Sequence, residues 1–381
     1  MKKILSVILM LIMITGMIIS TYAKENMPVD IKAKSAVLID ADSGKVLLKY
    51  NENQKLPPAS VTKLMTVLLT CEALNNKTIS FKTKIAASPT AAAKGGSQIW
   101  LKEGEVMTVS ELLKATCVSS ANDACTALAE QIAGSEEAFV NLMNEKAQSL
   151  GMKNTHFENC TGLDDTAENH YSSAYDIALM SRQVLKNKYI TNFTTIWMDS
   201  LRNGKTELVN TNKLVRFYKG ITGLKTGMTA KAGFCVSASA KRDDTQLIAV
   251  VMGSSSSSDR FETAKALLNW GFANYKTVVP EIDKKLITDV EVISGVKNSI
   301  KPVADIKNKI FVKQGDEKNI KKDISLAVNV KAPVEKNQVL GTITYSLNGE
   351  KLSVVNLLSP EKIDKLTFKI LFLRLIGSLI C

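Results

Sequence analysis

A serine and a lysine stand three positions apart in Ser60-Val61-Thr62-Lys63, at the start of a long apolar segment. The segment runs to about Leu74 and is apolar on nearly every helical face, which predicts a buried helix starting at Ser60. Positions i and i+3 share a helix face, so the amine of Lys63 can reach the Ser60 hydroxyl. Burial and a nearby second cation would lower the pKa of this amine, and a neutral amine can accept a proton from a nucleophilic serine. The pattern therefore predicts acyl-transfer chemistry.

This spacing is weak evidence when it stands alone. The same S-x-x-K pattern recurs at Ser294–Lys297 and Ser359–Lys362, in a β-rich region and a linker. A serine at position 60 could equally be the N-cap of a buried helix. Further residues are needed to distinguish a nucleophile from a cap.

Two other short motifs supply such residues. Ser120-Ala121-Asn122 lies between two predicted helices, where an exposed hydroxyl and carboxamide can face a cleft. Lys225-Thr226-Gly227 leads into a predicted strand over 233–239; its glycine permits close backbone approach, and its lysine and threonine can hold an anion. Each motif alone also fits a loop, a cap or a turn before an edge strand. The ordered set of three is far more specific.

The hydrophobic patterns around these motifs predict helices alternating with short strands. A hairpin is predicted from two apolar runs around an Asp/Ser/Gly turn, and a closing helix is predicted after a serine-rich loop. The predicted ranges are strands 36–40, 46–50, 234–239 and 247–252, helices 60–74, 108–118, 121–133, 136–150, 174–186 and 261–275, and a loop over 253–258.

The chain changes character beyond about Val278. Short β-type runs over 290–293, 310–312, 325–330 and 341–345 alternate with Lys/Asp/Asn/Gly turns, which predicts a small all-β domain. The final stretch, 366–381, is apolar with two cations inside it.

Together the three motifs match the serine signature of penicillin-recognising enzymes. The chain resembles the low-molecular-mass penicillin-binding proteins that act as serine-type D-alanyl-D-alanine carboxypeptidases. The resemblance covers almost the whole chain, including Pro57-Pro58-Ala59-Ser60, Ser120–Ala124, Gly223–Gly227 and the stretch from Arg260-Phe261 to Trp270-Gly271-Phe272. It implies a mixed α/β fold of the β-lactamase/transpeptidase type, with an antiparallel sheet flanked by helices, and a second, smaller all-β domain.

The resemblance also implies an order of parts along the chain. A signal peptide is expected over 1–23 and a catalytic domain over 29–275. A small β-rich domain over 280–358 and a membrane-associating tail over 360–381 would follow.

Roles for the matching residues follow from the same resemblance. Ser60 would attack the carbonyl between two terminal D-alanines, and Lys63 would take its proton. Ser120 would relay a proton to the leaving amine, and Asn122 would hydrogen-bond the substrate peptide. The remaining substrate-binding residues would be Lys225, Thr226, Gly227, Met228 and Thr229.

Within that last group the resemblance implies further detail. Lys225 would keep the site electropositive, Thr226 and Thr229 would hold the terminal carboxylate, and the N–H groups of Ser60 and Met228 would form the oxyanion hole. The chain departs from some relatives in two places: Asn210-Thr211-Asn212 stands where they have a carboxylate-binding arginine, and Met228 stands where they have histidine.

Export is predicted from the N-terminus. Lys2 and Lys3 precede an apolar run over 4–20 and then Thr21-Tyr22-Ala23, the order of a secretory signal. An uncleaved membrane anchor is the alternative, and both place the protein outside the cytoplasm. The tail is expected on the outer face of the cytoplasmic membrane, or else packed on the β domain.

Composition bears on the partners. The net charge is +12, but the lysines are spread along the chain without a basic block, so nucleic-acid binding is not predicted. Anionic wall polymers fit such a surplus. Peptidoglycan stem peptides are the expected substrates, and β-lactam antibiotics the expected covalent inhibitors.

Other site chemistries are less consistent with the sequence. The six cysteines have no framework spacing, which leaves any disulfide open, and the two histidines do not predict a metal site; no cofactor is expected. A class A β-lactamase would need an E-x-x-L-N glutamate, which is absent between Asn122 and Lys225. A Ser-His-Asp hydrolase is disfavoured by the lack of G-x-S-x-G. A non-catalytic wall-binding protein stays open, although all three motifs are intact.

Overall fold

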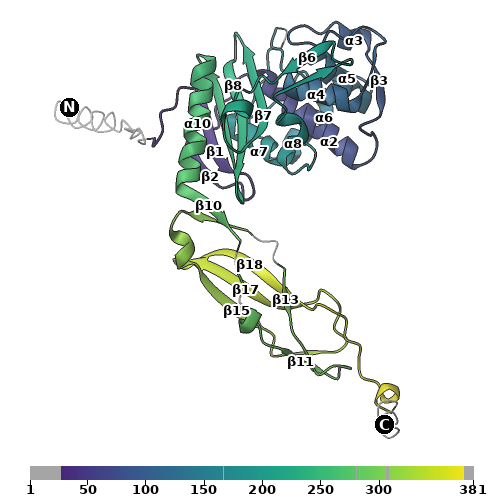
Figure 1. The fold of residues 1–381 in the computed structure, drawn as a ribbon, viewed down its shortest axis with the longest axis vertical. Helices are drawn as coiled ribbons and strands as arrows, with labels where there is room; N and C mark the ends of the chain where they lie inside the picture. Colours follow the sequence, from purple (N-terminus) through teal and green to yellow (C-terminus); the bar gives the residue numbers. More distant parts are fainter. Residues whose placement is uncertain (1–26, 166, 280, 283, 306–308, 373–381) are drawn as a thin grey trace, which may run out of the picture.

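The computed structural model describes residues 27–165, 167–279, 281–282, 284–305 and 309–372. A larger part of helices and strands and a smaller part of strands follow one another along the long axis (Figure 1). The predicted signal peptide, 1–23, lies outside the described residues.

A five-stranded antiparallel sheet forms the centre of the larger part. Its order is β2-β1-β9-β8-β7, so the N-terminal hairpin pairs with a late strand and β7 is an open edge. Alternate residues of β1 and β9 contribute to two different hydrophobic cores, because successive strand side chains point to opposite faces. The strands are β1 (Ser35–Asp40), β2 (Val46–Tyr50), β7 (Ile221–Thr229), β8 (Gly233–Arg242) and β9 (Thr245–Ser254).

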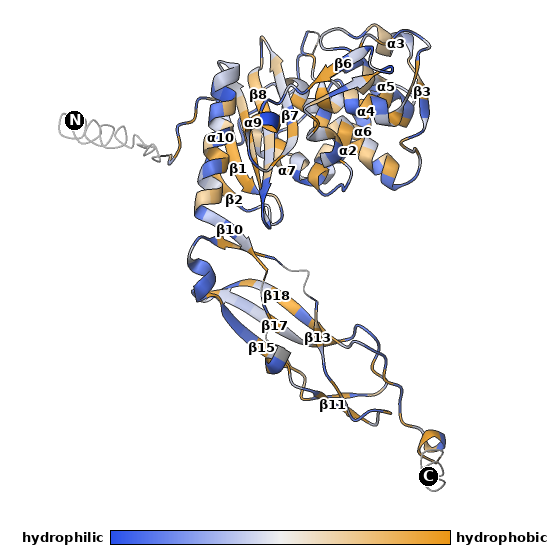
Figure 2. Cartoon of the chain, viewed as in Figure 1, coloured by the Kyte–Doolittle hydropathy of each residue, from blue (hydrophilic) through white to orange (hydrophobic). Residues whose placement is uncertain are grey.

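Helices cover both faces of this sheet. Helix α10 (Ser257–Asn274) packs on β8 and β9, and α7 (Ala174–Leu185) packs on β1 and β9 in the other core. Beyond α7 lies a helical layer made of α2 (Lys63–Asn75), α4 (Val109–Val118), α5 (Asn122–Ala133) and α6 (Glu136–Ser149). Figure 2 shows the apolar residues concentrated in these strands and helices.

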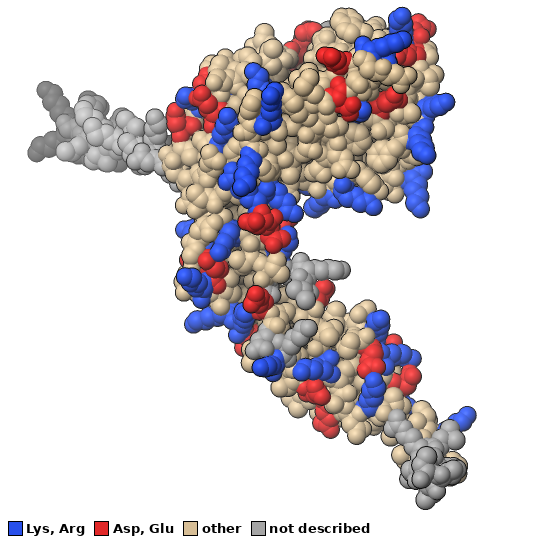
Figure 3. Space-filling view, viewed as in Figure 1, with Lys and Arg blue, Asp and Glu red and all other residues tan. Residues whose placement is uncertain are grey.

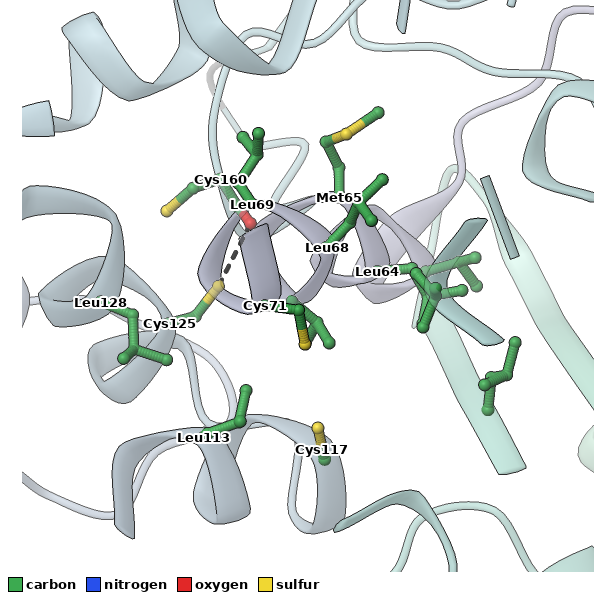
Figure 4. Close-up of a cluster of buried hydrophobic side chains, with 14 of the residues drawn as sticks. Leu64, Met65, Leu68, Leu69, Cys71, Leu113, Cys117, Cys125, Leu128 and Cys160 are labelled. Atoms are coloured by element: carbon green, nitrogen blue, oxygen red, sulfur yellow. Dashed lines mark hydrogen bonds between the residues drawn. The ribbon is translucent and has the colours of Figure 1, made fainter. Parts of the chain in front are cut away.

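Helix α2 lies at the middle of the helical layer. Ten of its thirteen residues are buried, as its nearly uniform apolar sequence predicts. Leu64, Met65 and Leu68 are among its buried side chains, and Leu113 of α4 and Leu128 of α5 belong to the same hydrophobic core (Figure 4). This packing surrounds α2 on all sides, so it also fixes the position of Lys63 in the first turn of the helix.

Short elements connect these layers. They are β3 (Lys84–Ala86), α3 (Pro89–Ala92), β4 (Val106–Thr108), α8 (Thr191–Thr194), β5 (Met198–Leu201), β6 (Thr206–Val209) and α9 (Leu214–Phe217). The hairpin of β5 and β6 and the helix α9 precede β7 directly.

The smaller part is built mainly of strands. Its sheets have the orders β10-β14, β12-β11-β16 and β13-β18-β17-β15, around two small cores of their own. The strands are β10 (Tyr275–Val278), β11 (Val290–Ile293), β12 (Ser299–Ile300), β13 (Val303–Ala304), β14 (Ile310–Lys313), β15 (Lys321–Leu326), β16 (Asn329–Lys331), β17 (Val339–Leu347) and β18 (Glu350–Leu358). The predicted fold class, a mixed α/β fold followed by a smaller all-β domain, is confirmed.

Two local predictions are wrong, and one strand was not predicted. Residues 253–258 do not form a loop: Gly253 and Ser254 end β9, and the Ser256 side chain caps α10 by accepting from the Asp259 N–H. The Lys225–Gly227 motif leads into β8 as predicted, but it lies within a strand of its own, β7, which was not predicted. The predicted strand over 325–330 is divided between β15 and β16.

The predicted tail also begins too early. Ile363 is fully buried and pairs with Val334, and Lys365 pairs with Gly295, so the small domain extends past residue 360. Residues 368–372 are helical and lie at the end of the small domain remote from the larger part (Figure 1). Within the described segments, no helix combines the length and apolar character needed to cross a membrane.

Charged side chains are dispersed. On the face in Figure 3, lysines and arginines are scattered over both parts and interleaved with acidic side chains. The five cysteines in the described segments are buried and free, and Cys381 lies outside them.

Candidate active site

Ser60 lies in a tight turn immediately before α2. The turn, η1 (Ala59–Thr62), is a 3-10 helix, and Lys63 is the first residue of the α-helix. Ala59 has a φ of 47°, an unusual backbone for a residue with a Cβ, of the kind that accumulates at functional sites. Ser60 stays half-buried while the residues around it are buried, so its hydroxyl can be approached from outside.

The amine of Lys63 is buried against this turn. It donates to Ser60 Oγ at 2.9 Å and to the Thr161 carbonyl oxygen at 2.8 Å. Burial lowers the pKa of Lys63 to about 8, because the charged form loses its hydration. The amine is therefore far easier to deprotonate than an exposed lysine.

The loop that contains Thr161 braces the turn. The side-chain oxygen of Asn159 accepts from the N–H groups of Thr161 and Gly162 at 3.1 and 2.7 Å. Gly162 has a φ of 83°, and a Cβ built on it would lie 1.9 Å from the Ala59 carbonyl oxygen. Only a glycine allows the loop to approach so closely.

A buried histidine, His170, also holds the same turn in place. The Nδ1 of His170 accepts from the Glu158 N–H at 3.1 Å, so Nε2 carries the proton and donates to Thr62 Oγ1 at 2.8 Å. Burial lowers the pKa of His170 to about 4, which keeps the ring neutral. Its contacts hold the turn and do not reach Ser60.

The second motif forms the turn between α4 and α5. Ser120 has a φ of 66°, and both Ser120 and Asn122 are buried, although exposed side chains were expected. Asn122 Nδ2 donates to the Gly95 carbonyl at 2.7 Å, while its Oδ1 is buried without a hydrogen-bond partner in the described chain. Asp123 fixes the adjacent loop by accepting from the N–H groups of Ile99 and Leu101.

The third motif lies in the edge strand β7. The Lys225 amine is buried and donates to the Thr226 carbonyl at 2.9 Å. Burial, and then the charge of Lys63, hold the pKa of Lys225 well below its usual range. A nearby cation was expected to lower the pKa of Lys63, but in the structure this effect lowers the pKa of Lys225.

Hydroxyl groups follow along the same strand. Thr226 Oγ1 donates to Thr211 Oγ1 at 2.7 Å, and Thr229 Oγ1 donates to the Asp164 carboxylate at 2.5 Å. Thr211, in the Asn210–Asn212 segment, therefore contacts the third motif directly.

Gly227 brings the third motif against the Ser60 turn. A Cβ at this position would lie 2.8 Å from the Pro58 carbonyl oxygen and 2.9 Å from the Ser60 nitrogen. The next residue, Met228, is 59% exposed. The backbone N–H of Ser60 and the backbone of Gly227 and Met228 thus share one small region beside the Ser60 hydroxyl.

The structure unites residues that are far apart in sequence. Lys63 interacts electrostatically with Lys225 and also with Cys125 of α5, next to the second motif. Three supporting residues were not predicted: Thr161, His170 and Thr211. The Asn159–Gly162 turn chemistry could have indicated the first, but nothing local indicates the other two.

Two known families match the chain. Residues 21–256 match the family described as D-alanyl-D-alanine carboxypeptidase. Residues 275–365 match the C-terminal domain of penicillin-binding protein 5.

Individual proteins are similar over most of the chain. D-alanyl-D-alanine carboxypeptidase DacF of Bacillus subtilis is 42% identical, covering 99% of both chains. The crystal structure of penicillin-binding protein 5 from Haemophilus influenzae is 33% identical with a TM-score of 0.73, covering 89% of this chain and 99% of that one. Ampicillin-bound penicillin-binding protein D2 from Listeria monocytogenes is 28% identical with a TM-score of 0.59, covering 64% and 99%.

The approach of the 159–162 loop to the Ser60 turn can be tested with a matched pair of glycines. Gly162 and Gly134 have φ values of 83° and 85°, but a Cβ on Gly134 would meet nothing within 4 Å. Gly134→Ala should cost about 1–2 kcal/mol of unfolding free energy from the left-handed backbone alone. Gly162→Ala should cost at least about 2 kcal/mol more, because the loop or the turn must move. Urea unfolding followed by tryptophan fluorescence measures both, and equal losses would contradict the close contact.

Proposed function

The chain belongs to the D-alanyl-D-alanine carboxypeptidase family, whose serine enzymes remove the terminal D-alanine of peptidoglycan pentapeptides through a penicillin-sensitive acyl-enzyme, and we propose that Ser60 is the nucleophile. The observation that carries this proposal is the 2.9 Å contact between Ser60 Oγ and the buried amine of Lys63. A nucleophile within hydrogen-bond reach of a base, itself oriented by a third group, is the arrangement that covalent catalysis requires.

Lys63 is the general base of the acylation step. A neutral amine keeps two N–H donors and one lone pair, and its bond to the Thr161 carbonyl uses one donor and orients the group. The lone pair can then accept the Ser60 proton while Ser60 Oγ bonds to the carbonyl carbon of the scissile peptide.

The developing oxyanion is held by two backbone N–H groups, those of Ser60 and Met228. Gly227 lies against the Ser60 nitrogen, so donors from the turn and from the strand edge converge. Preorganised donors of this kind stabilise the charge where it appears in the transition state. Asn122, whose Oδ1 is buried without a partner in the described chain, accepts from an N–H of the substrate peptide.

Collapse of the tetrahedral intermediate breaks the carbon–nitrogen bond. The leaving amine of D-alanine takes a proton relayed by Ser120 from Lys63. Water then attacks the acyl-enzyme, its proton passes to the Lys63 and Ser120 pair, and Ser60 is released with its hydroxyl restored.

Lys225, Thr226 and Thr229 receive the terminal carboxylate. An arriving anion favours the charged form of Lys225, which opposes the effect of its burial. The hydroxyl of Thr226, now bonded to Thr211, can turn to the carboxylate. Charge-assisted contacts of this type are worth about 1.5–3 kcal/mol each, which favours a free C-terminus over a blocked one.

We further propose that the protein is exported and held at the outer face of the cytoplasmic membrane. Its parts would be a signal peptide over 1–23, a catalytic domain over 29–275, a small β domain from 280 and a tail from about 366. Phe368, Leu371 and Phe372 are 82%, 45% and 51% exposed. They stand at helical spacings of three and four and therefore share one face, suited to an interfacial helix.

Benzylpenicillin should form a stable covalent adduct on Ser60, because its strained amide offers a carbonyl to the same nucleophile. The purified protein should also release D-alanine from a pentapeptide ending in D-Ala-D-Ala. Ser60→Ala should abolish both, and Ser119→Ala, a serine in the nearby α4 cap, should abolish neither. Mass spectrometry locates the adduct; an adduct on any other serine would refute the assignment.

The acylation rate should rise with pH through about 8, because Lys63 accepts a proton only when neutral and its pKa is about 8. Below that pH the protonated fraction grows and the rate falls tenfold per pH unit. Lys63→Arg should lower the rate by about 10²–10⁴, since guanidinium stays charged. Lys146→Arg, on a lysine paired with Glu72, is the control. A stopped-flow rate with fluorescent penicillin that is flat from pH 6 to 10 would show that the base lies elsewhere.

The tail should bind vesicles of anionic phospholipid. Phe368→Asp with Phe372→Asp should abolish sedimentation of the signal-cleaved protein, residues 24–381, with such vesicles, because the substitutions remove both aromatic side chains from the apolar face. Val328→Asp, at an 86% exposed apolar position of the small domain, should have no effect. Undiminished sedimentation of the double variant would place the membrane contact elsewhere.

A further inference from the structure

Arg260 lies in the first turn of α10 with its side chain buried against the sheet. One terminal nitrogen, Nη1, donates to the carbonyl oxygens of Gly227 and Cys235 at 3.1 and 3.2 Å. These two residues face each other across β7 and β8. The other terminal nitrogen donates to Ser257 Oγ at 3.1 Å. The guanidinium thus links the edge strand β7 to its neighbour β8.

The Gly227 carbonyl belongs to the same peptide unit as the Met228 N–H. A trans peptide is planar, and its C=O and N–H point in opposite directions. With the carbonyl directed to Arg260 on the sheet side, the N–H is directed away from it, out of the open edge of β7. That edge is where Gly227 lies against the Ser60 nitrogen.

The interactions of the Arg260 side chain do little to stabilise the fold. Arg260 is 6% exposed, and none of the ion pairs found within the described segments includes it. Its Nε is buried without a hydrogen-bond partner in the same segments. A buried charge with incomplete hydrogen bonding destabilises a fold, and apolar groups of similar volume are often better. Stacking on Phe234 and Phe261 offsets only part of that loss.

We propose that Arg260 is a positioning residue for the oxyanion hole, acting through the Gly227–Met228 peptide. By donating to the Gly227 carbonyl, the guanidinium fixes the plane of that peptide and draws electron density toward its oxygen. The Met228 N–H then points at the oxyanion and becomes a stronger donor, because hydrogen bonds in a chain polarise one another. This inference rests on the proposed function and assigns a residue that does not itself touch the substrate.

Steady-state kinetics separate this role from a general loss of structure. Arg260→Met should lower kcat about 10–100-fold, with kcat calculated from the concentration of active sites that penicillin titrates. This loss is smaller than the loss expected when a whole oxyanion-hole donor is removed. KM should change by less than about threefold, because the donor acts on the charge that appears in the transition state. Arg260→Lys keeps the charge but bonds with one nitrogen and should recover part of kcat.

An infrared measurement reports on the hole itself. The acyl-enzyme is formed with a β-lactam whose ring carbonyl is labelled with carbon-13, and its stretching band is recorded. Weaker donation to this carbonyl in Arg260→Met should move the band to higher wavenumber or add a second, higher band. Arg182→Met is the matched control: Arg182 also donates to two carbonyls, those of Ala41 and Asp42, away from the site. Its band and its kcat should match the wild type.

The possible outcomes are distinct. An unshifted band in Arg260→Met, or a fall in kcat that is equal in Arg182→Met, would overturn the role of Arg260 and leave Ser60 as nucleophile. If the wild-type protein forms no adduct on Ser60, the proposed function fails and this inference fails with it. A shifted band and a selective loss of kcat, partly restored by lysine, would support it.

Discussion

The placement of the Lys63 amine in a buried site beside Ser60 is the constraint on which the rest of the structure depends. An amine without hydration favours its neutral form, and only the neutral form can act as a base. Burial of this kind requires apolar packing around the first turn of α2 and a hydrogen-bond acceptor that replaces water. The helical layer supplies the packing, and the Thr161 carbonyl supplies the acceptor.

The sheet supplies the opposite side of the site. Among the described residues, no strand pairs with the outer side of its edge strand β7, so the β7 backbone is available to the Ser60 turn. Contact is possible because residue 227 has no Cβ, and the same principle applies to Gly162 on the loop side. Two glycines thus set the width of the site from two directions. Both contacts depend on the backbone. The side chains of the three motifs then supply the charged and hydroxyl groups of the site.

Several elements of the fold followed from hydrophobic periodicity alone. The hairpin of β1 and β2 and the helices α4, α5, α6 and α7 match the predicted ranges to within one residue at every end. Prediction errors occurred where a polar residue type is compatible with two kinds of local structure. The serines at 256–258 could form a loop or begin a helix, and only the position of β9 and the packing of α10 decide between them.

For the site, the sequence by itself determined the reactive residue types, their spacing and their order, because S-x-x-K, S-x-N and K-T-G are each local. It also determined that α2 would be buried. Tertiary structure alone decided that Thr161 accepts from Lys63, that Thr211 bonds Thr226 and that Arg260 holds the Gly227 carbonyl. These pairs are separated by 98, 15 and 33 positions. No local pattern encodes such contacts, because they arise from how layers pack and not from the conformation of any one segment.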